Sequence, residues 1–156
     1  MPIVEQSAII RAPANIVMEA LNDVENIPNW ATVTGTVTNV QGHGPGMTYE
    51  WHYRFNKLSF DGYSEVLEQT STTLVTKTTG DVDSIWTINL TAIGASGTAM
   101  SVVVEYTPPS TFIELLADIL LEQLSDPAVA QQNMLRFKEM VETQAKLAEK
   151  QVAARA

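Results

Sequence analysis

The chain has no cysteine, and this absence removes several kinds of chemistry at once. Disulfide bonds, thiol nucleophiles and cysteine-based metal sites are all excluded. Histidine is scarce as well, because only His43 and His52 are present. These two histidines lie in different predicted elements, and no carboxylate is placed to complete a ligand set around them. We therefore predict no metal site and no cofactor.

Long apolar runs and basic clusters are also missing. No segment approaches the roughly 18 consecutive apolar residues of a membrane span, and residues 1–6 lack the basic start and apolar run of a signal peptide. We therefore expect no stable membrane insertion and a cytoplasmic location. Nine Lys and Arg stand against 18 Asp and Glu, for a net charge of −9. Without a basic cluster to neutralise phosphates, we do not expect nucleic-acid binding.

A strict alternation at residues 47–56 is the strongest pattern present. Large apolar residues occupy the odd positions: Met47, Tyr49, Trp51, Tyr53 and Phe55. Polar or charged residues occupy the even positions: Thr48, Glu50, His52, Arg54 and Asn56. This period of two predicts a β-strand with one buried face and one solvent face. The buried face then either packs in a core or lines a cavity.

The rest of the chain predicts one α+β domain covering residues 1–156. A strand at 3–11 precedes a short helix at 14–22 that opens after Pro13. We expect a second short helix from about Asp23 to Trp30, capped by Asn22 or Asp23. Val- and Thr-rich runs separated by Gly-containing turns predict six further antiparallel strands, at 33–41, 47–56, 58–68, 72–79, 84–93 and 97–107.

Residues after Pro108-Pro109 have a helical composition. We expect one helix at 111–124 and another from Asp126-Pro127 to about residue 152. The second carries an apolar stripe at helical spacing: Ala130, Met134, Phe137, Met140, Val141, Gln144, Leu147 and Ala148. A single helix about 10 Å wide cannot fill a curved sheet of seven strands. A hollow between sheet and helix is therefore expected.

Four short motifs, in this order, resemble those of the START-like superfamily, also known as polyketide cyclase/dehydrase and lipid-transport proteins. Residues 10–17 (IRAPANIV) resemble the family's I-x-A-P-x-x-x-V opening, and residues 22–30 (NDVENIPNW) its D-x-E-x-x-P-x-W segment. A Gly-rich turn at 42–46 and the sequence YTPP at 106–109 complete the set. The resemblance spans essentially the whole chain. It implies the helix-grip (START/Bet v 1-like) fold, in which a seven-stranded antiparallel sheet curves around a long C-terminal helix.

The resemblance leaves the function open, because this superfamily includes carriers, receptors, cyclases, lyases and chaperone cofactors. We expect binding of an apolar or amphipathic, lipid- or polyketide-like molecule between sheet and C-terminal helix. One alternative is a cyclase- or dehydratase-type enzyme that uses the same cavity, with Tyr49 or Tyr53 as proton donor or hydrogen-bond anchor. Another is a protein-interaction module, or a homodimer, that uses the apolar segment 112–124.

The candidate ligand-binding residues are apolar or aromatic side chains expected on the inner surfaces of the sheet and helices, and core packing is the alternative for each of them. They are Trp30, Tyr49, Trp51, Tyr53, Phe55, Trp86, Met100, Phe112, Leu116, Met134 and Phe137. Trp30 is interpreted either as a lid over the pocket or as a plug that fixes the second short helix to the sheet. No catalytic residue is assigned.

Two orientations matter for any catalytic interpretation. Alternation places Glu50, His52 and Arg54 on the solvent face, where charged cross-strand neighbours are ordinary. The inward face of strand 58–68 is left open, because Phe60 and Val66 compete with Tyr63 and Leu67. If Tyr63 pointed inward, Glu65 would join it as a potential acid or base.

Overall fold

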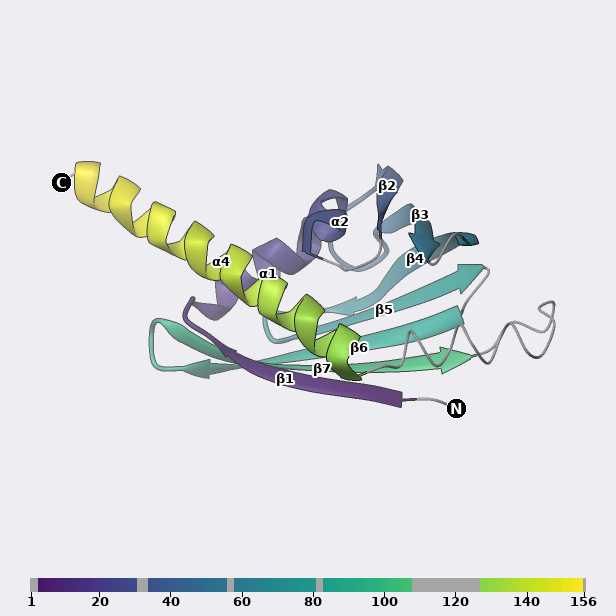
Figure 1. Cartoon of the computed structure of the whole chain (residues 1–156). Helices are drawn as coiled ribbons and strands as arrows, with labels where there is room; N and C mark the ends of the chain where they lie inside the picture. The colour runs from purple at the N-terminus through teal and green to yellow at the C-terminus, as the bar shows by residue number, and fades with distance from the viewer. Residues whose placement is uncertain (1–2, 31–33, 56–57, 81–82, 108–126, 156) are drawn as a thin grey trace.

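The computed structural model describes residues 3–30, 34–55, 58–80, 83–107 and 127–155. The described elements follow the predicted order of strand, short helices, six strands and a long helix (Figure 1). Their bounds are β1 Ile3–Ile10, α1 Ala14–Asn22, η1 Val24–Asn26, α2 Ile27–Trp30, β2 Thr34–Gln41, β3 Thr48–Phe55, β4 Leu58–Gln69, β5 Thr73–Gly80, β6 Asp83–Ile93, β7 Gly97–Thr107 and α4 Pro127–Arg155. The predicted helix at 111–124 lies outside the described residues.

The strands form one seven-stranded antiparallel sheet, as predicted. Its order is β1-β7-β6-β5-β4-β3-β2, so β2 to β7 form a meander and β1 joins it through β7. The β1–β7 pairing runs without a shift from Ile3 opposite Glu105 to Ile10 opposite Thr98. The first strand therefore pairs with the last, which leaves β1 and β2 as the two edges.

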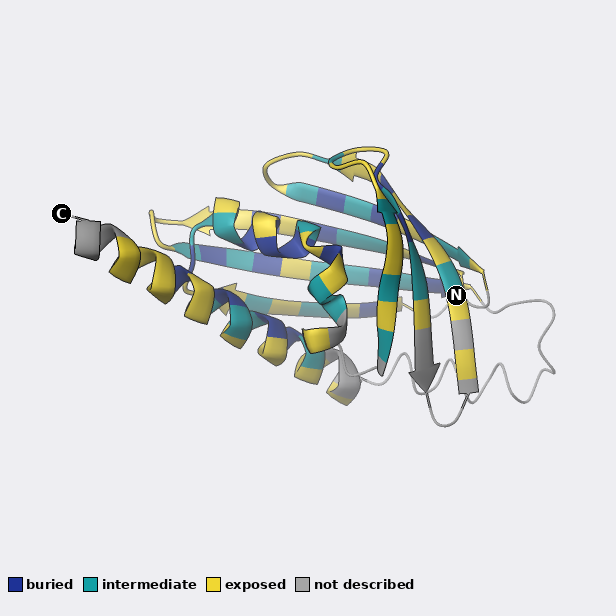
Figure 2. Ribbon diagram, turned by 90° about the horizontal axis from the view of Figure 1, so that it is seen from above, coloured by how far each residue is buried: buried dark blue, intermediate teal, exposed yellow. Residues whose placement is uncertain are grey.

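The helices lie on one face of this sheet (Figures 1 and 2). Helix α4 runs along β1 and also contacts α1 and α2, while α1 reaches β6 and β7. The buried side chains of α4 repeat at helical spacing and are Met134, Phe137, Val141 and Ala145. The predicted apolar stripe is wrong for three of its members, because Gln144 and Ala148 are exposed and Leu147 is 54% exposed. Helix α4 is buried as far as Ala145, and its C-terminal end extends past the sheet (Figure 1).

The face of the sheet that points toward the helices is here called the inner face, and alternate residues of each strand lie on it. In β4, Ser64 and Val66 are buried, whereas Tyr63 and Leu67 are each 48% exposed. The even residues of this strand therefore point inward, which decides the orientation that the sequence leaves open. Glu65 is consequently exposed on the outer face. An acid or base role for it in an inner cavity is excluded.

The second short helix is more broken than predicted. A 3₁₀ turn, η1, is followed by α2, a single α-helical turn that ends at Trp30. Asp23 occupies the position before η1, but its side chain makes no capping hydrogen bond, and Asn22 Oδ1 has no hydrogen-bond partner among the described residues. The expected cap is therefore wrong. Among the described helices, none is long and apolar enough to cross a membrane.

An ion pair on α4 also ties this helix to the residue after β1. Lys138 Nζ lies 2.5 Å from Glu142 Oε2, and the backbone N–H of Arg11 donates to the same oxygen at 3.3 Å. Burial raises the pKa of Glu142, but the hydrogen bonds and charges of Lys138 and Arg11 lower it by more. The net pKa of Glu142 therefore lies below its ordinary value of 4.5.

Replacing Glu142 with glutamine is expected to lower the free energy of unfolding at neutral pH by about 0.5–1 kcal/mol. A carboxylate whose pKa is lower in the folded state stabilises the fold above its unfolded pKa, and this contribution is lost as pH falls through the folded pKa. Urea unfolding of wild type and Glu142→Gln should therefore give curves that converge at acidic pH. Glu139→Gln, at an exposed position on the same helix, is the control. A difference that stays constant down to about pH 3 would contradict the assignment.

Candidate ligand site on the inner face

The odd-numbered, largely aromatic side chains at the start of the alternating segment point inward, as predicted. Met47 and Tyr49 are buried and Trp51 is partly buried, whereas His52 on the other parity is exposed. The side chains of Tyr53 and Phe55 lie outside the described residues. The orientation of the alternating segment is therefore confirmed for its first half, and contact with a ligand stays a prediction.

The other candidate residues come from α2, β6, β7 and α4. Met100, Met134 and Phe137 are buried, and Trp30 and Trp86 are partly buried. Phe112 and Leu116 lie outside the described residues. The even-numbered residues of β6 and β7 point inward, as expected, since Ile88, Leu90, Val104 and Tyr106 are buried.

Trp30 connects the short helices to α4. Its ring meets the ring of Phe137 edge to face, with a centroid distance of 5.1 Å and an interplanar angle of 68°. This geometry is favourable for aromatic pairs and fixes α2 against α4. The indole Nε1 of Trp30 is buried and has no hydrogen-bond partner among the described residues. Trp30 therefore joins α2 to α4 and leaves one donor in the interior without a partner among the described residues, and its role as a lid or a plug stays a prediction.

A row of hydroxyl side chains crosses the inner face, one from each of five neighbouring strands. The strand register pairs Tyr49 with Ser64, Ser64 with Thr78, Thr78 with Ser84, and Ser84 with Tyr106. All but Thr78 are less than 9% exposed, and Thr78 is partly buried. We call these five residues the hydroxyl row. It is a polar line on a face that is otherwise largely apolar.

Hydrogen bonds satisfy part of the hydroxyl row. Ser64 Oγ and Thr78 Oγ1 are 2.7 Å apart, and the Tyr49 hydroxyl is hydrogen-bonded to Ser64. Trp86 Nε1 donates to Ser84 Oγ at 3.2 Å. Tyr106 has no hydrogen-bond partner among the described residues. The two halves of the hydroxyl row therefore differ, with a bonded half on β3–β5 and a less saturated half on β6–β7.

Burial changes the acidity of both tyrosines in the hydroxyl row. It raises the pKa of Tyr49, an effect that the hydrogen bond with Ser64 reduces. It raises the pKa of Tyr106 to about 12. Both phenols are therefore protonated at neutral pH, because desolvation disfavours the phenolate. They are hydrogen-bond donors rather than bases.

The charged residues of β3 and β4 form a separate network on the outer face. His52 Nδ1 lies 2.7 Å from Asp61 Oδ1, and His52 Nε2 lies 3.2 Å from Thr38 Oγ1. Glu50 Oε2 is 3.9 Å from the same Nε2. The side chain of His52 is 45% exposed, which confirms the predicted solvent orientation of His52. The side chain of Arg54 lies outside the described residues.

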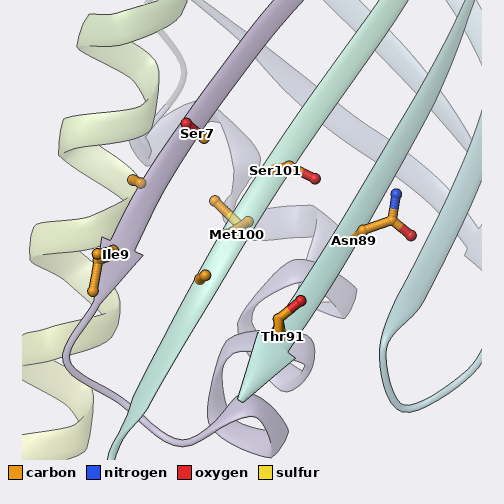
Figure 3. A pocket seen from close by; sticks show the side chains of 8 residues that line it. Ser7, Ile9, Asn89, Thr91, Met100 and Ser101 are labelled. Atoms are coloured by element: carbon orange, nitrogen blue, oxygen red, sulfur yellow. The ribbon is translucent and has the colours of Figure 1, made fainter. Parts of the chain in front are cut away.

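A pocket of about 400 Å³ lies over β1, β6 and β7 on the outer face (Figure 3). Its lining is mainly small and polar, with Ser7, Asn89, Thr91 and Ser101 beside Ile9. Met100 is the one predicted ligand-binding residue that borders it. This pocket is therefore distinct from the predicted hollow, which belongs to the opposite face of the sheet.

The hydroxyl row is the feature that sequence reasoning missed. Ser64, Thr78 and Ser84 are small residues, and nothing in their immediate neighbours distinguishes them. Tyr106 is expected on the inner face, but not as a candidate site residue. The available signal is a hydroxyl residue at an inward position in each of several strands. Aligning these positions requires the strand register, because one residue of slip moves a side chain to the other face.

Comparison with known proteins supports the architecture. No curated protein matches the sequence at a significant level, whereas several solved structures have the same fold. The protein TTHA0849 from Thermus thermophilus superposes with a TM-score of 0.75 and 17% identity, over 92% of this chain and 99% of that one. The Zhui aromatase/cyclase from a Streptomyces species gives 0.67 and 16%, over 92% and 93%. A START superfamily protein from Mycobacterium smegmatis gives 0.64 and 11%, over 94% and 98%.

These identities are low, so the structural similarities establish the fold alone. The family is established by the sequence. Residues 1–142 match the model of the family described as "Polyketide cyclase / dehydrase and lipid transport". This match covers most of the 156 residues and agrees with the resemblance found in the short motifs. The chain belongs to the polyketide cyclase / dehydrase and lipid transport family, a part of the START-like superfamily with the helix-grip fold.

Proposed function

We propose that this protein binds an apolar or amphipathic small molecule in a cavity between the inner face of the sheet and α4. The position of α4 is the observation that carries the proposal. Its extensive contacts with the described strands are with β1, at one edge of the sheet. The short helices η1 and α2 contact β2 at the opposite edge. The helices that cover this face therefore approach it from its two sides.

The dimensions of the sheet support a hollow between these helices and the middle strands. Adjacent strands are about 4.8 Å apart, so β4, four positions from β1, lies roughly 19 Å from the strand that α4 follows. A helix is only about 10 Å across. Helix α4 on β1 therefore does not reach the middle of the sheet, and α1 covers only β6 and β7 there. A small molecule against β3–β5, along the hydroxyl row that continues onto β6 and β7, would use this space.

The family supports the same proposal at a coarser level, since its description includes both lipid transport and polyketide cyclisation. A cyclase- or dehydratase-type reaction in the same cavity is the second candidate, with Tyr49 as proton donor. Burial keeps Tyr49 protonated, which suits a hydrogen-bond donor. The described inner face, however, offers no carboxylate or histidine to act as a base. These residues therefore favour binding over catalysis.

Three further expectations stay predictions. The interaction module and the homodimer both depend on the segment 112–124, which lies outside the described residues. The cytoplasmic location is an expectation from the sequence alone. None of the three enters the proposal.

Filling the proposed cavity should weaken binding strongly. Thr78 is partly buried on the inner face of β5, so a Thr78→Phe substitution places a ring in the space that a ligand would occupy. We expect the affinity of this variant for Nile red, a neutral apolar dye, to fall by about tenfold or more, because the phenyl ring would occupy the space in which the dye binds. Dye fluorescence titration measures this, and native mass spectrometry of the purified wild type should show a co-purified small molecule.

The matched control is Thr79→Phe, the neighbouring residue, whose side chain points to the outer face of the same strand. Its affinity for the dye should stay within about twofold of wild type. Equal affinities of both variants would place dye binding elsewhere. A wild type that binds no dye and carries no small molecule would refute the proposed function.

A further inference from the structure

The inner face of the sheet offers hydrogen-bonding groups but no charged side chain among the residues described. Its polar members include the hydroxyl row, Thr76, Thr98, Gln6, Gln69 and the indole of Trp86. Charged residues of the same strands take outward positions, as in Glu5, Glu50, Glu65, Lys77 and Glu105. The buried residues of α4 that face the sheet are apolar as well. A ligand on this face would therefore meet dipoles but no counter-charge.

The β6–β7 half of the hydroxyl row is the part able to hold a ligand group. Tyr106 is 8% exposed, and its hydroxyl has no hydrogen-bond partner among the described residues. The paired residue Ser84 accepts a hydrogen bond from Trp86 Nε1 at 3.2 Å and still has a hydroxyl proton to donate. The Tyr106 hydroxyl is not among the fully buried atoms that lack a partner, so both hydroxyl groups have a proton to donate to an acceptor that reaches the inner face. An oxygen atom on a ligand would supply that acceptor.

The absence of counter-charge limits what this oxygen can belong to. A hydroxyl or carbonyl oxygen needs only one or two hydrogen bonds when it leaves water. A carboxylate loses far more hydration, and without a nearby cation the loss is not recovered. On the basis of the proposed function, we infer that this site selects uncharged ligands with a hydroxyl or carbonyl group, held by Tyr106 and Ser84, and discriminates against carboxylates of equal chain length.

A matched pair of probes tests the inference. 1-Decanol and decanoate share a ten-carbon chain, but decanoate is an anion at neutral pH. Displacement of bound Nile red should show 1-decanol binding at least about tenfold more tightly than decanoate. Tyr106→Phe removes one hydroxyl group and should weaken 1-decanol binding by about three- to tenfold, the usual effect of one neutral hydrogen bond. Decanoate binding should not change.

Two further variants complete the design. Tyr63→Phe makes the same chemical change on the outer face, where Tyr63 is 48% exposed, and should leave both affinities unaltered. Ser84→Ala is a second test of the site if Tyr106→Phe does not fold. Decanoate binding as tightly as 1-decanol would overturn the inference, as would unchanged 1-decanol affinity in both site variants. Failure of wild type to bind either the dye or 1-decanol would overturn the proposed function itself, and the inference with it.

Discussion

Phe137→Ala is expected to lower the free energy of unfolding by about 3–5 kcal/mol, the largest effect predicted for this chain. Phe137 is 1% exposed and is the ring of α4 that meets Trp30 edge to face. The substitution removes a large buried side chain and leaves a cavity that its neighbours only partly refill. It also removes the contact that fixes α2 against α4. Urea unfolding followed by circular dichroism measures the change.

Leu135→Ala is the control for this prediction. Leu135 lies two residues earlier on the same helix and is 49% exposed, so its truncation should change the free energy of unfolding by less than about 0.5–1 kcal/mol. The helix propensity of alanine is at least as high as that of leucine or phenylalanine, so neither change weakens the helix itself. Similar losses in the two variants would contradict the assignment of Phe137 to the core.

Gly80→Ala is expected to cost about 2–4 kcal/mol, the second largest effect. Gly80 ends β5 with a φ of +136°, a conformation that is essentially restricted to glycine. A Cβ atom there would lie 2.5 Å from the backbone oxygen of Asp61 and 3.0 Å from Gly62 Cα. Both contacts are with the backbone of β4, which cannot move without disturbing the β4–β5 pairing. Strain and steric overlap therefore act together.

Gly94→Ala separates these two causes. Gly94 also has a positive φ, of +65°, but an added Cβ would meet nothing within 4 Å. This φ lies in the left-handed region, where a residue with a Cβ costs about 1–2 kcal/mol. Thermal and urea unfolding of the two variants should rank Gly80→Ala clearly below Gly94→Ala in stability. The reverse order would show that β4 and β5 do not approach so closely at Gly80.

Much of the fold was predictable from local patterns. The period of two in residues 47–56 identified β3 and its inward parity, because alternation follows directly from strand geometry. Proline marked the start of α1 and of α4, because it lacks the N–H that the first helical turn does not need. The failures were also local in origin. The predicted stripe on α4 extends too far, to Ala148, since periodicity alone does not show where the sheet beneath a helix ends.

The candidate site was predictable only in part. Tyr49, Met100 and Phe137 were chosen because they are large and apolar, and they are buried. Ser64, Thr78 and Ser84 were not chosen, because a small hydroxyl residue inside a strand is common and its neighbours in other strands are unknown. The inward face of β4 was undecided for a related reason. Tyr63 and Val66 both fit a strand, and only packing against the helices selects between them.

By itself, the sequence determined the order of the elements, the solvent-facing position of His52 and the membership of a family. These follow from short-range geometry and from motifs within one segment. Only the tertiary structure decided that β1 closes the sheet against β7, that α4 follows one edge, and that five hydroxyl groups align across five strands. Each of these depends on register between segments far apart in the chain. Such register is set by the cooperative burial of whole faces, which no single segment encodes.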